Sequence, residues 1–486
     1  MTIDQTATMD QPDIFYNGRW VPADSKKVVE IVNPATEELV GTAPDANAAD
    51  VDAAVRAAHD AFLHSGWSQL KPADRGAHLS RMADHLEAHA AEAGTFITSE
   101  NGTQVGQSIG VNGHGSAGVI RYYASLAGTF EVEEDRGTSL VRKEPVGVAA
   151  LIIPWNGPHI LAAQKLGPAL AMGCAVVIKP AAGTSLDIRF ITEAAAAAGI
   201  PDGIVNVVSG DRETGSHLVE HELISHVSFT GSAANGRAVA AACGQGLKSV
   251  TLELGGKSAA ILLDDANVDT FLAQMPWVCL GNSGQGCFMN TRVVVDRSRY
   301  EEVCDGIVET LRTLPVGDPL DPATAFGPVA NSRQHEQVLS YIESGRSEGA
   351  RVLIGGGRPT GLDRGFFVEA TVFTDVAPQM RIFREEIFGP VLVVVPADGE
   401  EDAIAIANDS EYGLGGVVYT GDRDRGNAVA RRIDTGTIGV NGYTLDPTVP
   451  FGGVKHSGLG RELGPEGLQP YFTYKSIYQE STAHAG

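Results

Sequence analysis

Cysteine and positive charge are both scarce in this chain of 486 residues. The five cysteines are an odd number at irregular spacings without a CxxC pair, so they indicate neither a disulfide framework nor a zinc site. No HExxH motif occurs, and we expect no metal. Lysine and arginine number 36 against 60 aspartates and glutamates, and the formal charge of −24 argues against nucleic acid or an anionic membrane as the main partner.

Long hydrophobic runs are missing as well. No window approaches the ~20 apolar residues of a membrane span, and the opening MTIDQTATMDQPD lacks the basic start and apolar stretch of a signal peptide. We therefore expect a cytoplasmic protein in which residues 1–16 form a flexible tail. The composition, 43% hydrophobic and 20% charged, is typical of a globular enzyme, and the length favours two lobes of roughly 200 residues each.

The part of the chain from residue 147 to 254 alternates between the patterns of buried strands and helices. GVAALIIP, CAVVIKP, GIVNVVSG, SHVSFTGS and KSVTLELGG are continuous apolar runs of the kind found in parallel sheets. They predict a doubly wound α/β lobe that binds ligands beyond the carboxyl ends of its strands, where IIPWN, VIKPA and FTGS fall. From Gly256 onward, SAAILL, NTRVVVD, ARVLIGG and GPVLVVVPA predict a second α/β lobe.

Other segments predict how the lobes are completed. FYNGRWVPA is typical of two strands joined by an Asn-Gly turn, and amphipathic helices are expected over 47–62 and from about Pro72. FEVEEDRGTSLVRKEP and YFTYKSIYQE are polar-alternating strands far apart in the sequence. They could pair in a small extra sheet that reaches another subunit, or they could be unrelated edge strands.

Cys287 is the best candidate for a nucleophile. It lies in GNSGQGCFMNTR, where glycines allow a ligand to approach the backbone and leave the thiol open. A cysteine is more often structural than catalytic, so this context alone leaves both roles open. The remaining cysteines lie in apolar or helical stretches and are expected in the core: Cys174, Cys243, Cys279 and Cys304.

Three further features could take part in catalysis or cofactor binding. Glu253 ends a buried strand in LELGGKS, and a desolvated carboxylate suits a general base, although a salt bridge to Lys257 or a nearby arginine is an equal alternative. Asn156 in PWN could stabilise an oxyanion, or it could be an ordinary turn residue. FTGSAANG offers Ser232 as a helix cap and glycines for a phosphate, or a plain strand-to-helix turn.

Together these motifs resemble the aldehyde dehydrogenase superfamily from about Phe15 to Tyr478. IIPWN, VIKPA, FTGS, LELGGKS, GQGC, EEIFGP and PFGGVKHSGLGRELG stand in the family's order with family-like spacings. The resemblance implies oxidation of an aldehyde to the carboxylic acid with NAD(P)+. It makes Cys287 the nucleophile, Glu253 the base that activates water against the thioester, and Asn156 the oxyanion donor together with the Cys287 backbone N–H.

The same resemblance assigns the cofactor contacts. Lys179 is expected at the adenosine ribose, Ser232 at the pyrophosphate, Glu386 at the nicotinamide ribose and Phe388 beside the ring. Lys165 and Glu462 match positions of a proton relay from the base, with a buried structural ion pair as the alternative. The other residues expected to line the cleft are Ile152, Ile153, Pro154, Trp155, Gly210, Thr230, Gly231 and Leu254.

Several positions depart from the family's common pattern. Ala182 stands where NAD-using members often carry a glutamate that holds the ribose hydroxyls, so NADP is an alternative to NAD, although no added arginine is evident nearby. Gly157 replaces a common phenylalanine and Gln164 an occasional tryptophan, which predicts a wide mouth and a medium-sized or aromatic aldehyde. The other residues expected near the aldehyde are His159, Phe288, Met289, Tyr443 and Leu445.

The resemblance implies two doubly wound, Rossmann-like lobes plus a small β sheet for oligomerisation. The cofactor-binding domain is expected over 17–128 and 143–254, and the catalytic domain over 255–440. Segments 129–142 and 469–486 supply the oligomerisation strands of a homodimer or homotetramer, and 441–468 returns to the cofactor-binding lobe and lines the active site. The rivals are a CoA-acylating semialdehyde dehydrogenase, against which Glu253 argues, and a non-catalytic dinucleotide-binding protein.

Overall fold

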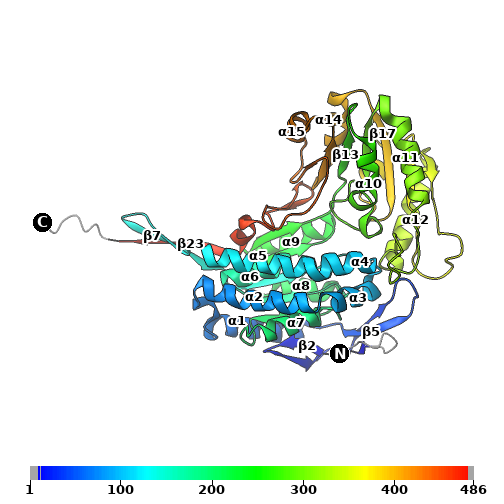
Figure 1. The fold of residues 1–486 in the computed structure, drawn as a ribbon. Helices are drawn as coiled ribbons and strands as arrows, with labels where there is room; N and C mark the ends of the chain where they lie inside the picture. Colours follow the sequence, from blue (N-terminus) through cyan, green and yellow to red (C-terminus); the bar gives the residue numbers. More distant parts are fainter. Residues whose placement is uncertain (1–8, 11–12, 480–486) are drawn as a thin grey trace.

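The computed structural model describes residues 9–10 and 13–479, and it shows two lobes with a narrow sheet projecting from one of them (Figure 1). Each lobe is built on one large, mostly parallel sheet, and a separate three-stranded sheet forms the projection. The predicted α/β class with two doubly wound lobes is therefore confirmed. Residues 1–8 and 11–12 of the predicted tail, and 480–486 of the predicted C-terminal strand segment, lie outside the described residues.

The first lobe contains an eight-stranded sheet in the order β22-β12-β11-β8-β9-β10-β2-β3. The chain runs outward from β8 to β10 and then returns to β11 on the other side of β8, so the strand order reverses between β8 and β11. A reversal of this kind opens a ligand-binding crevice at the carboxyl ends of the strands. The parallel strands are β8 (Val148–Ile152), β9 (Ala175–Lys179), β10 (Val205–Val207), β11 (Ile224–Thr230) and β12 (Ser249–Glu253).

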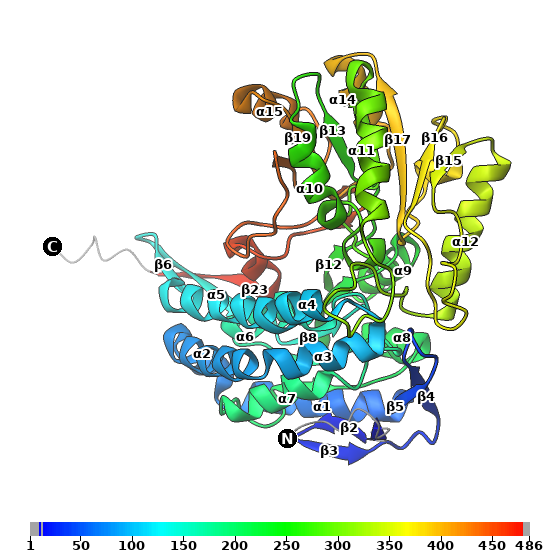
Figure 2. The ribbon, with the colours of Figure 1, turned by 45° about the vertical axis from the view of Figure 1, so that its right-hand side comes forward.

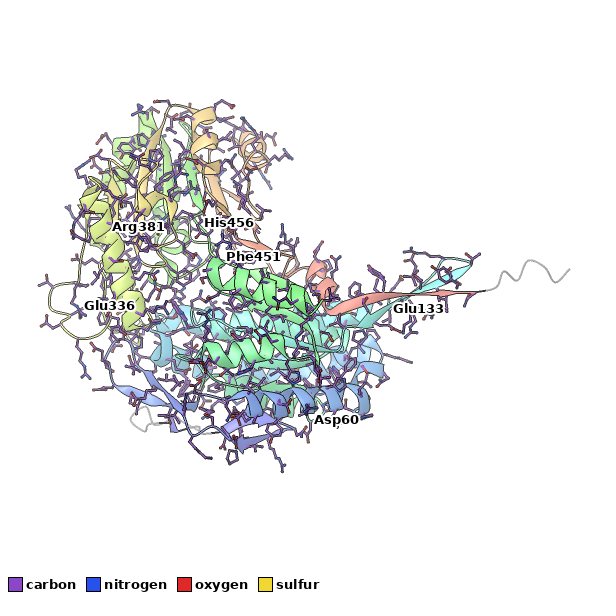
Figure 3. The ribbon with its side chains drawn as sticks, turned by 180° about the vertical axis from the view of Figure 1, so that it is seen from behind. Asp60, Glu133, Glu336, Arg381, Phe451 and His456 are labelled. Carbon is purple, nitrogen blue, oxygen red and sulfur yellow. The ribbon has the colours of Figure 1, made fainter. Side chains whose placement is uncertain are left out.

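Helices cover both faces of this sheet (Figures 1 and 3). Helices α2 and α5 pack against α6 in one layer, while α1, α8 and α9 pack together in the other. The predicted helices at 47–62 and from Pro72 are confirmed as α1 and α2, and Asn47 caps α1 by accepting the N–H groups of Ala49 and Asp50. The bounds are α1 (Ala48–His64), α2 (Pro72–Ala88), α3 (Ala90–Asn101), α4 (Val105–Ser108), α5 (Ser116–Thr129), α6 (Pro158–Met172), α7 (Ile188–Ala197), α8 (Arg212–Glu220) and α9 (Ala233–Gln245).

The second lobe has a seven-stranded sheet in the order β15-β16-β17-β14-β13-β19-β20, in which only β15 is antiparallel to its neighbour (Figure 2). Its strands are β13 (Ala259–Leu262), β14 (Arg292–Asp296), β15 (Arg351–Ile354), β16 (Thr371–Thr374), β17 (Val391–Ala397), β19 (Gly416–Tyr419) and β20 (Gly439–Val440). Its helices are α10 (Val268–Val278), α11 (Tyr300–Arg312), α12 (Ser332–Ser347), α13 (Arg381–Arg384), α14 (Glu400–Asn408) and α15 (Arg423–Ala430).

The N-terminal hairpin corrects one expectation. Strands β2 (Asp13–Tyr16) and β3 (Arg19–Pro22) flank Asn17 and Gly18, whose positive φ angles of 51° and 72° suit the predicted tight turn. β2 also pairs with β10, so residues 13–16 belong to the sheet and not to a flexible tail. The physical reason is burial of the apolar pair Ile14 and Phe15, which are 2% and 7% exposed.

The two polar-alternating segments do pair, although they are far apart in the sequence. β23 (Phe472–Tyr478) runs antiparallel to β7 (Ser139–Pro145), and β6 (Glu133–Asp135) completes the sheet. Figure 3 shows this sheet leaving the body of the molecule, with Glu133 on it. β7 extends to Pro145, three residues past the segment 129–142 predicted to hold the first oligomerisation strand.

Short strands fasten the remaining segments. β22 (Gly458–Leu459) pairs with β12, which brings the segment after residue 441 back to the first sheet. The other short strands are β1 (Met9–Asp10), β4 (Val28–Val32), β5 (Leu39–Pro44), β18 (Tyr412–Gly413) and β21 (Val454–Lys455). Among the described residues, no helix combines the length and apolar character needed to cross a bilayer.

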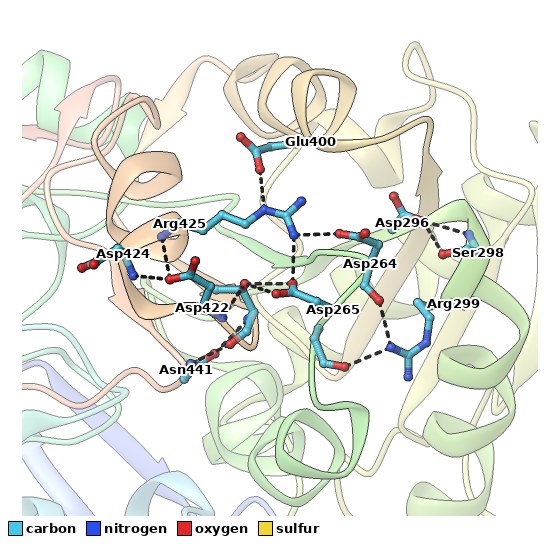
Figure 4. Close-up of polar contacts among 12 residues, drawn as sticks. Asp264, Asp265, Asp296, Ser298, Arg299, Glu400, Asp422, Asp424, Arg425 and Asn441 are labelled. Atoms are coloured by element: carbon cyan, nitrogen blue, oxygen red, sulfur yellow. Dashed lines mark hydrogen bonds and ion pairs between the residues drawn. The ribbon is translucent and has the colours of Figure 1, made fainter.

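An ion-pair network joins the elements at one end of the second sheet (Figure 4). The Arg425 guanidinium on α15 donates to Glu400 at the start of α14 at 2.7 Å and to Asp264 after β13 at 2.8 Å. Asp265 lies 3.1 Å from the same guanidinium and accepts the Thr420 hydroxyl at 2.8 Å. One arginine therefore ties three separate segments together.

Candidate active site

The catalytic candidates lie at strand ends and on adjoining loops of both lobes. Asn156 follows β8, Glu253 is the last residue of β12, and Cys287 lies in the loop that precedes β14. A Cβ on Gly256 would lie only 2.3 Å from the Cys287 carbonyl oxygen, so the loop after Glu253 packs directly on the backbone of Cys287. Gly256 of LELGGKS is therefore required for this close approach.

Cys287 differs from the other four cysteines in its exposure. It is half-buried, whereas the others are buried, as predicted for core residues, and all five are free thiols. Burial raises the pKa of the Cys287 thiol well above its ordinary value, and the nearby Glu253 and Glu386 carboxylates raise it further. The thiol therefore needs a base to become a nucleophile.

Glu253 has the surroundings of such a base. It is 1% exposed, and among the described residues neither of its carboxylate oxygens makes a hydrogen bond of normal geometry. Burial raises its pKa well above the ordinary value and the Glu462 charge adds to this, while Lys165 and the nearby Cys287 thiol act in the opposite direction. The alternative of a salt bridge to Lys257 is wrong, because that amine is itself buried without a partner in the described part of the chain.

Lys165 and Glu462 form a buried ion pair next to Glu253. Both side chains are at most 5% exposed, and the Lys165 amine also donates to the Thr230 hydroxyl at 2.7 Å. The Ser228 hydroxyl donates to the bonded Glu462 oxygen at 3.2 Å, and the other Glu462 oxygen has no partner among the described residues. The ion pair is thus present, and the proton relay stays a prediction.

Asn156 is bound to the loop that carries Cys287. Its side-chain amide donates to the Gln285 carbonyl at 3.0 Å, and the Asn282 amide donates to the Asn156 carbonyl, also at 3.0 Å. Asn101, which the sequence did not single out, donates to the neighbouring Trp155 carbonyl at 3.0 Å. These bonds fix the PWN turn against the nucleophile loop, although nothing in the motif itself identifies Asn101 or Asn282.

A cavity of about 620 Å³ opens at the carboxyl ends of β8, β9 and β11, and Ile152, Lys179 and Gly210 line it as predicted. The Lys179 amine donates to the Gly210 carbonyl at 2.6 Å and to the Pro180 carbonyl at 3.1 Å. Burial lowers its pKa to about 8. The size, the crevice position and the buried amine fit a nucleotide.

Two arginines line the same cavity as Ala182, although the sequence showed no arginine near that position. Arg212 and Arg333 line the cavity together with Ala182, and so do Phe229 and Asn235. Arg212 was missed because it lies thirty positions from Ala182 in the sequence, and Arg333 because it comes from the other lobe.

The remaining cofactor candidates surround the same cleft. The Ser232 hydroxyl accepts the Asn235 N–H at 3.3 Å and so caps α9, as predicted for this helix start. A Cβ on Gly231 would lie 2.6 Å from the Phe229 ring, and one on Gly236 would lie 2.5 Å from Leu254. These glycines let the backbone turn closely above the strands, where a pyrophosphate would need backbone donors.

The EEIFGP segment approaches from the second lobe. Glu386 Oε1 accepts the Gly256 N–H at 2.9 Å, and burial raises the pKa of this carboxyl to about 7. A Cβ on Gly255 would lie 2.1 Å from Glu386 Oε2, so both glycines after the base serve this contact. The Phe388 ring meets the Trp155 ring edge-on with centroids 5.4 Å apart, and Ile153 and Pro154 continue the same turn.

The predicted substrate residues divide into two groups. Phe288 stacks on Tyr443 with ring centroids 5.5 Å apart, Met289 packs against Gly281 and Gly286, and Leu445 is 37% exposed. His159 is 1% exposed and its Nε2 lies 3.0 Å from the Asp187 carbonyl oxygen, so its contact with the aldehyde stays a prediction.

Two further pocket candidates lie at the start of α6 and within it. A Cβ on Gly157 would come 3.1 Å from the Ile160 side chain, so the space there is already tight. Gln164 is 3% exposed, and its Oε1 has no partner in the described residues. Both residues therefore lie at or behind the wall, and the wide mouth stays a prediction.

Comparisons with known proteins agree with this geometry. The aldehyde dehydrogenase family model matches residues 20–477. A geranial dehydrogenase of Castellaniella defragrans is 48% identical, with 97% of this chain and 99% of the relative covered. A Mycobacterium tuberculosis aldehyde dehydrogenase solved with NAD+ has a TM-score of 0.96 and 43% identity, covering 98% of this chain and 99% of that chain. A Pseudomonas syringae aldehyde dehydrogenase C mutant, solved with NAD+ and octanal, has a TM-score of 0.94 and 38% identity, covering 96% of each chain. This chain therefore belongs to the aldehyde dehydrogenase family.

Proposed function

We propose that the chain oxidises an apolar aldehyde to its carboxylic acid through a thioester on Cys287, with NAD as the hydride acceptor. The observation that carries the proposal is a half-buried thiol beside a fully buried carboxylate without a partner among the described residues, in a fold that also holds a nucleotide-sized cavity at the ends of β8, β9 and β11. Two similar proteins were solved with NAD+, which supports the cofactor.

In the first step, the Cys287 sulfur forms a bond to the aldehyde carbon while the thiol proton moves to Glu253. We assign stabilisation of the resulting oxyanion to the Asn156 amide and the Cys287 backbone N–H. A bound nicotinamide dinucleotide supplies the acceptor for the hydride that leaves this carbon. The product of these bond changes is a thioester on Cys287.

Hydrolysis then needs Glu253 in its charged form. Glu253 loses the first proton before it accepts one from the attacking water, and the pair Glu462 and Lys165 is the proposed route for that proton. The C–S bond breaks, the acid leaves and the thiol regains its proton. The presence of Glu253 as a buried base supports hydrolysis of the thioester over its transfer to CoA. The presence of Cys287, Glu253 and Asn156 together argues against a non-catalytic protein.

An apolar aldehyde is favoured by the surroundings of the nucleophile loop. A second cavity, of about 590 Å³, is lined by Val111, Trp277 and Phe326 and reaches Gly281. A Cβ on Gly281 would contact Met289 at 3.4 Å, two residues from Cys287. The similar proteins named for geranial or solved with octanal support a hydrocarbon aldehyde as substrate.

The test follows absorbance at 340 nm with NAD+ and a panel of terpenoid, aliphatic, aromatic and betaine aldehydes, each with and without CoA. We expect reduction without CoA, with hydrocarbon aldehydes giving the highest kcat/KM. Reduction only in the presence of CoA would reject the hydrolytic mechanism, and a preference for betaine aldehyde would reject the apolar pocket.

We also propose that the sheet of β6, β7 and β23 joins this chain to a second copy in a homodimer or homotetramer. Tyr474 and Tyr478 on β23 are 60% and 85% exposed, which is unusual for large side chains on a projecting sheet. Light scattering after size-exclusion chromatography should give at least twice the mass of 50.9 kDa. A monomeric mass would reject this assembly, and a cytoplasmic location stays a prediction.

A further inference from the structure

We propose that His159 is a positioning residue for Asn156, and that it acts through a buried ring of hydrogen bonds formed with Asp187 and with the end of α3. The inference rests on the proposed function, in which the Asn156 amide stabilises the oxyanion, and it adds what holds that amide in place. Its starting point is a buried cluster that the proposed reaction does not use, because Glu100, Asp187 and His159 are each at most 1% exposed. Burying polar groups costs free energy unless they are hydrogen-bonded, so the bonds of this cluster show what it holds together.

His159 ties the start of α6 to the residue before α7. It is the second residue of α6 and lies three positions after Asn156. Its Nε2 is 3.0 Å from the Asp187 carbonyl oxygen and 3.8 Å from Oδ2 of the same residue, so the carbonyl is the hydrogen-bond partner. A carbonyl can only accept, and burial lowers the pKa of His159 to about 4. The neutral ring therefore carries its proton on Nε2 and donates a hydrogen bond to the Asp187 carbonyl.

Glu100 holds the other side of Asp187. Its Oε1 accepts the Leu186 N–H at 3.0 Å, and its Oε2 accepts the Asp187 N–H at 3.2 Å. Glu100 lies in the last turn of α3, so this helix fixes residue 187 at its N–H while His159 binds the same residue at its carbonyl. The Asp187 carboxyl oxygens have no hydrogen-bond partner among the described residues. The network therefore runs through the backbone of Asp187.

Asn101 closes the ring at the PWN turn. It is the last residue of α3, next to Glu100, and its side-chain amide donates to the Trp155 carbonyl at 3.0 Å. The end of α3 thus binds the turn just before Asn156 and, through the residue before α7, the helix just after it. Asn156 is therefore held between two anchored residues, Trp155 and His159.

The orientation of Asn156 decides whether its amide can serve the oxyanion. A side-chain amide has two N–H donors, and one of them is used by the Gln285 carbonyl at 3.0 Å. The second donor serves the oxyanion only while the turn keeps its place, because an oxyanion donor must lie within about 3 Å of the developing charge. Loosening the start of α6 should therefore slow the formation of the oxyanion and leave the binding of aldehyde and dinucleotide almost unchanged.

The experiment compares two substitutions of His159. His159→Leu removes the donor and keeps an apolar side chain in the core, whereas His159→Gln retains an N–H that can reach the Asp187 carbonyl. The rate of NADH formation is measured in a single turnover, with NAD+ saturating and the enzyme in excess over a hydrocarbon aldehyde. In His159→Leu we expect this rate to fall roughly 10- to 100-fold, as for a donor misplaced by about 1 Å. KM for the aldehyde and Kd for NAD+ should change less than about threefold, and His159→Gln should recover the rate to within about threefold of the wild type.

The matched control is His78→Leu on α2. The His78 ring makes the same kind of contacts, because its Nδ1 lies 2.9 Å from the Ala198 carbonyl oxygen and the ring meets Trp67 edge-on. This histidine joins α2 to the end of α7 and does not touch the PWN turn. We expect His78→Leu to lower the melting temperature, as His159→Leu does, and to keep the single-turnover rate.

The outcomes separate the inference from its rivals. A folded His159→Leu protein with the full rate, or a loss that His159→Gln does not recover, would overturn the inference alone. A raised KM with an unchanged rate would also overturn it, in favour of direct contact between His159 and the aldehyde. Asn101→Ala removes the other anchor and should reduce the same rate, which keeps the test decisive if His159→Leu does not fold. Absence of any dinucleotide reduction by the wild-type protein would overturn the proposed function as well.

Discussion

Gly256 offers a direct test of how tightly the base loop and the nucleophile loop are packed. In Gly256→Ala the new Cβ would lie 2.3 Å from the Cys287 carbonyl oxygen, about 1 Å closer than the 3.4 Å at which ordinary van der Waals contact begins. The clash is with backbone, so the Cys287 loop itself must move. A misplacement of about 1 Å at the reacting atoms can cost roughly a hundredfold in rate, or ~2.7 kcal/mol of barrier.

The assay is kcat from dinucleotide reduction, with the rate of Cys287 alkylation by iodoacetamide as a readout of thiol position. The matched control is Gly128→Ala on α5, where a Cβ would meet nothing within 4 Å. We expect the control to keep full activity and to gain up to ~1 kcal/mol of helix stability. A Gly256→Ala protein that is folded and retains kcat within about twofold would refute the packing argument.

Three further perturbations probe the electrostatics. Because Glu253 acts as a carboxylate and its pKa is raised, the rate of thioester hydrolysis should increase with pH through that raised pKa. In Glu253→Gln this limb of the pH–rate profile should vanish. If the limb survives, another base activates the water. Lys165→Met leaves Glu462 buried without its partner, so urea unfolding should show a free energy of unfolding about 3–5 kcal/mol lower. The pH–rate profile should also shift to higher pH, because Lys165 lowers the pKa of Glu253. An unchanged profile would count against electrostatic coupling between Lys165 and Glu253. Arg425→Ala should lower the free energy of unfolding by only ~1–2 kcal/mol, because the Arg425 side chain is 31% exposed. The variant should keep the KM for the aldehyde unchanged. A raised KM would contradict a purely structural role.

The central strands could be predicted because buried parallel strands form continuous apolar runs. β8, β9 and β11 are such runs, and all but two of their positions are almost completely covered by helices or neighbouring strands. β16, with four residues, and β20, with two, were missed because segments this short show no recognisable hydrophobic periodicity. Ile14 and Phe15 were assigned to a tail because only tertiary contact with β10 makes them core residues.

In the site, too, some residues could be predicted from their sequence neighbours, and others are recognised only in the folded chain. Cys287 and Glu253 stand out in the sequence because each lies beside glycines that permit close backbone approach. Arg212 and Arg333 could not be found in this way, since only the folded chain brings them to Ala182. His159 lies on α6 with its Nε2 3.0 Å from the Asp187 carbonyl oxygen, a buried contact that proximity to PWN in the sequence does not reveal.

The most direct test of the central claim is mass spectrometry of Glu253→Gln after mixing with NAD+ and a hydrocarbon aldehyde. Because Glu253 also takes the thiol proton, the mixture is kept at alkaline pH, where the Cys287 thiol can ionise without that carboxylate. We then expect close to one equivalent of NADH per chain in a burst, followed by slow turnover, and an acyl group on the peptide that contains Cys287. Acylation at another cysteine, or steady turnover at the wild-type rate without an acyl-enzyme, would contradict the assignment of Cys287 as nucleophile and Glu253 as the base for hydrolysis.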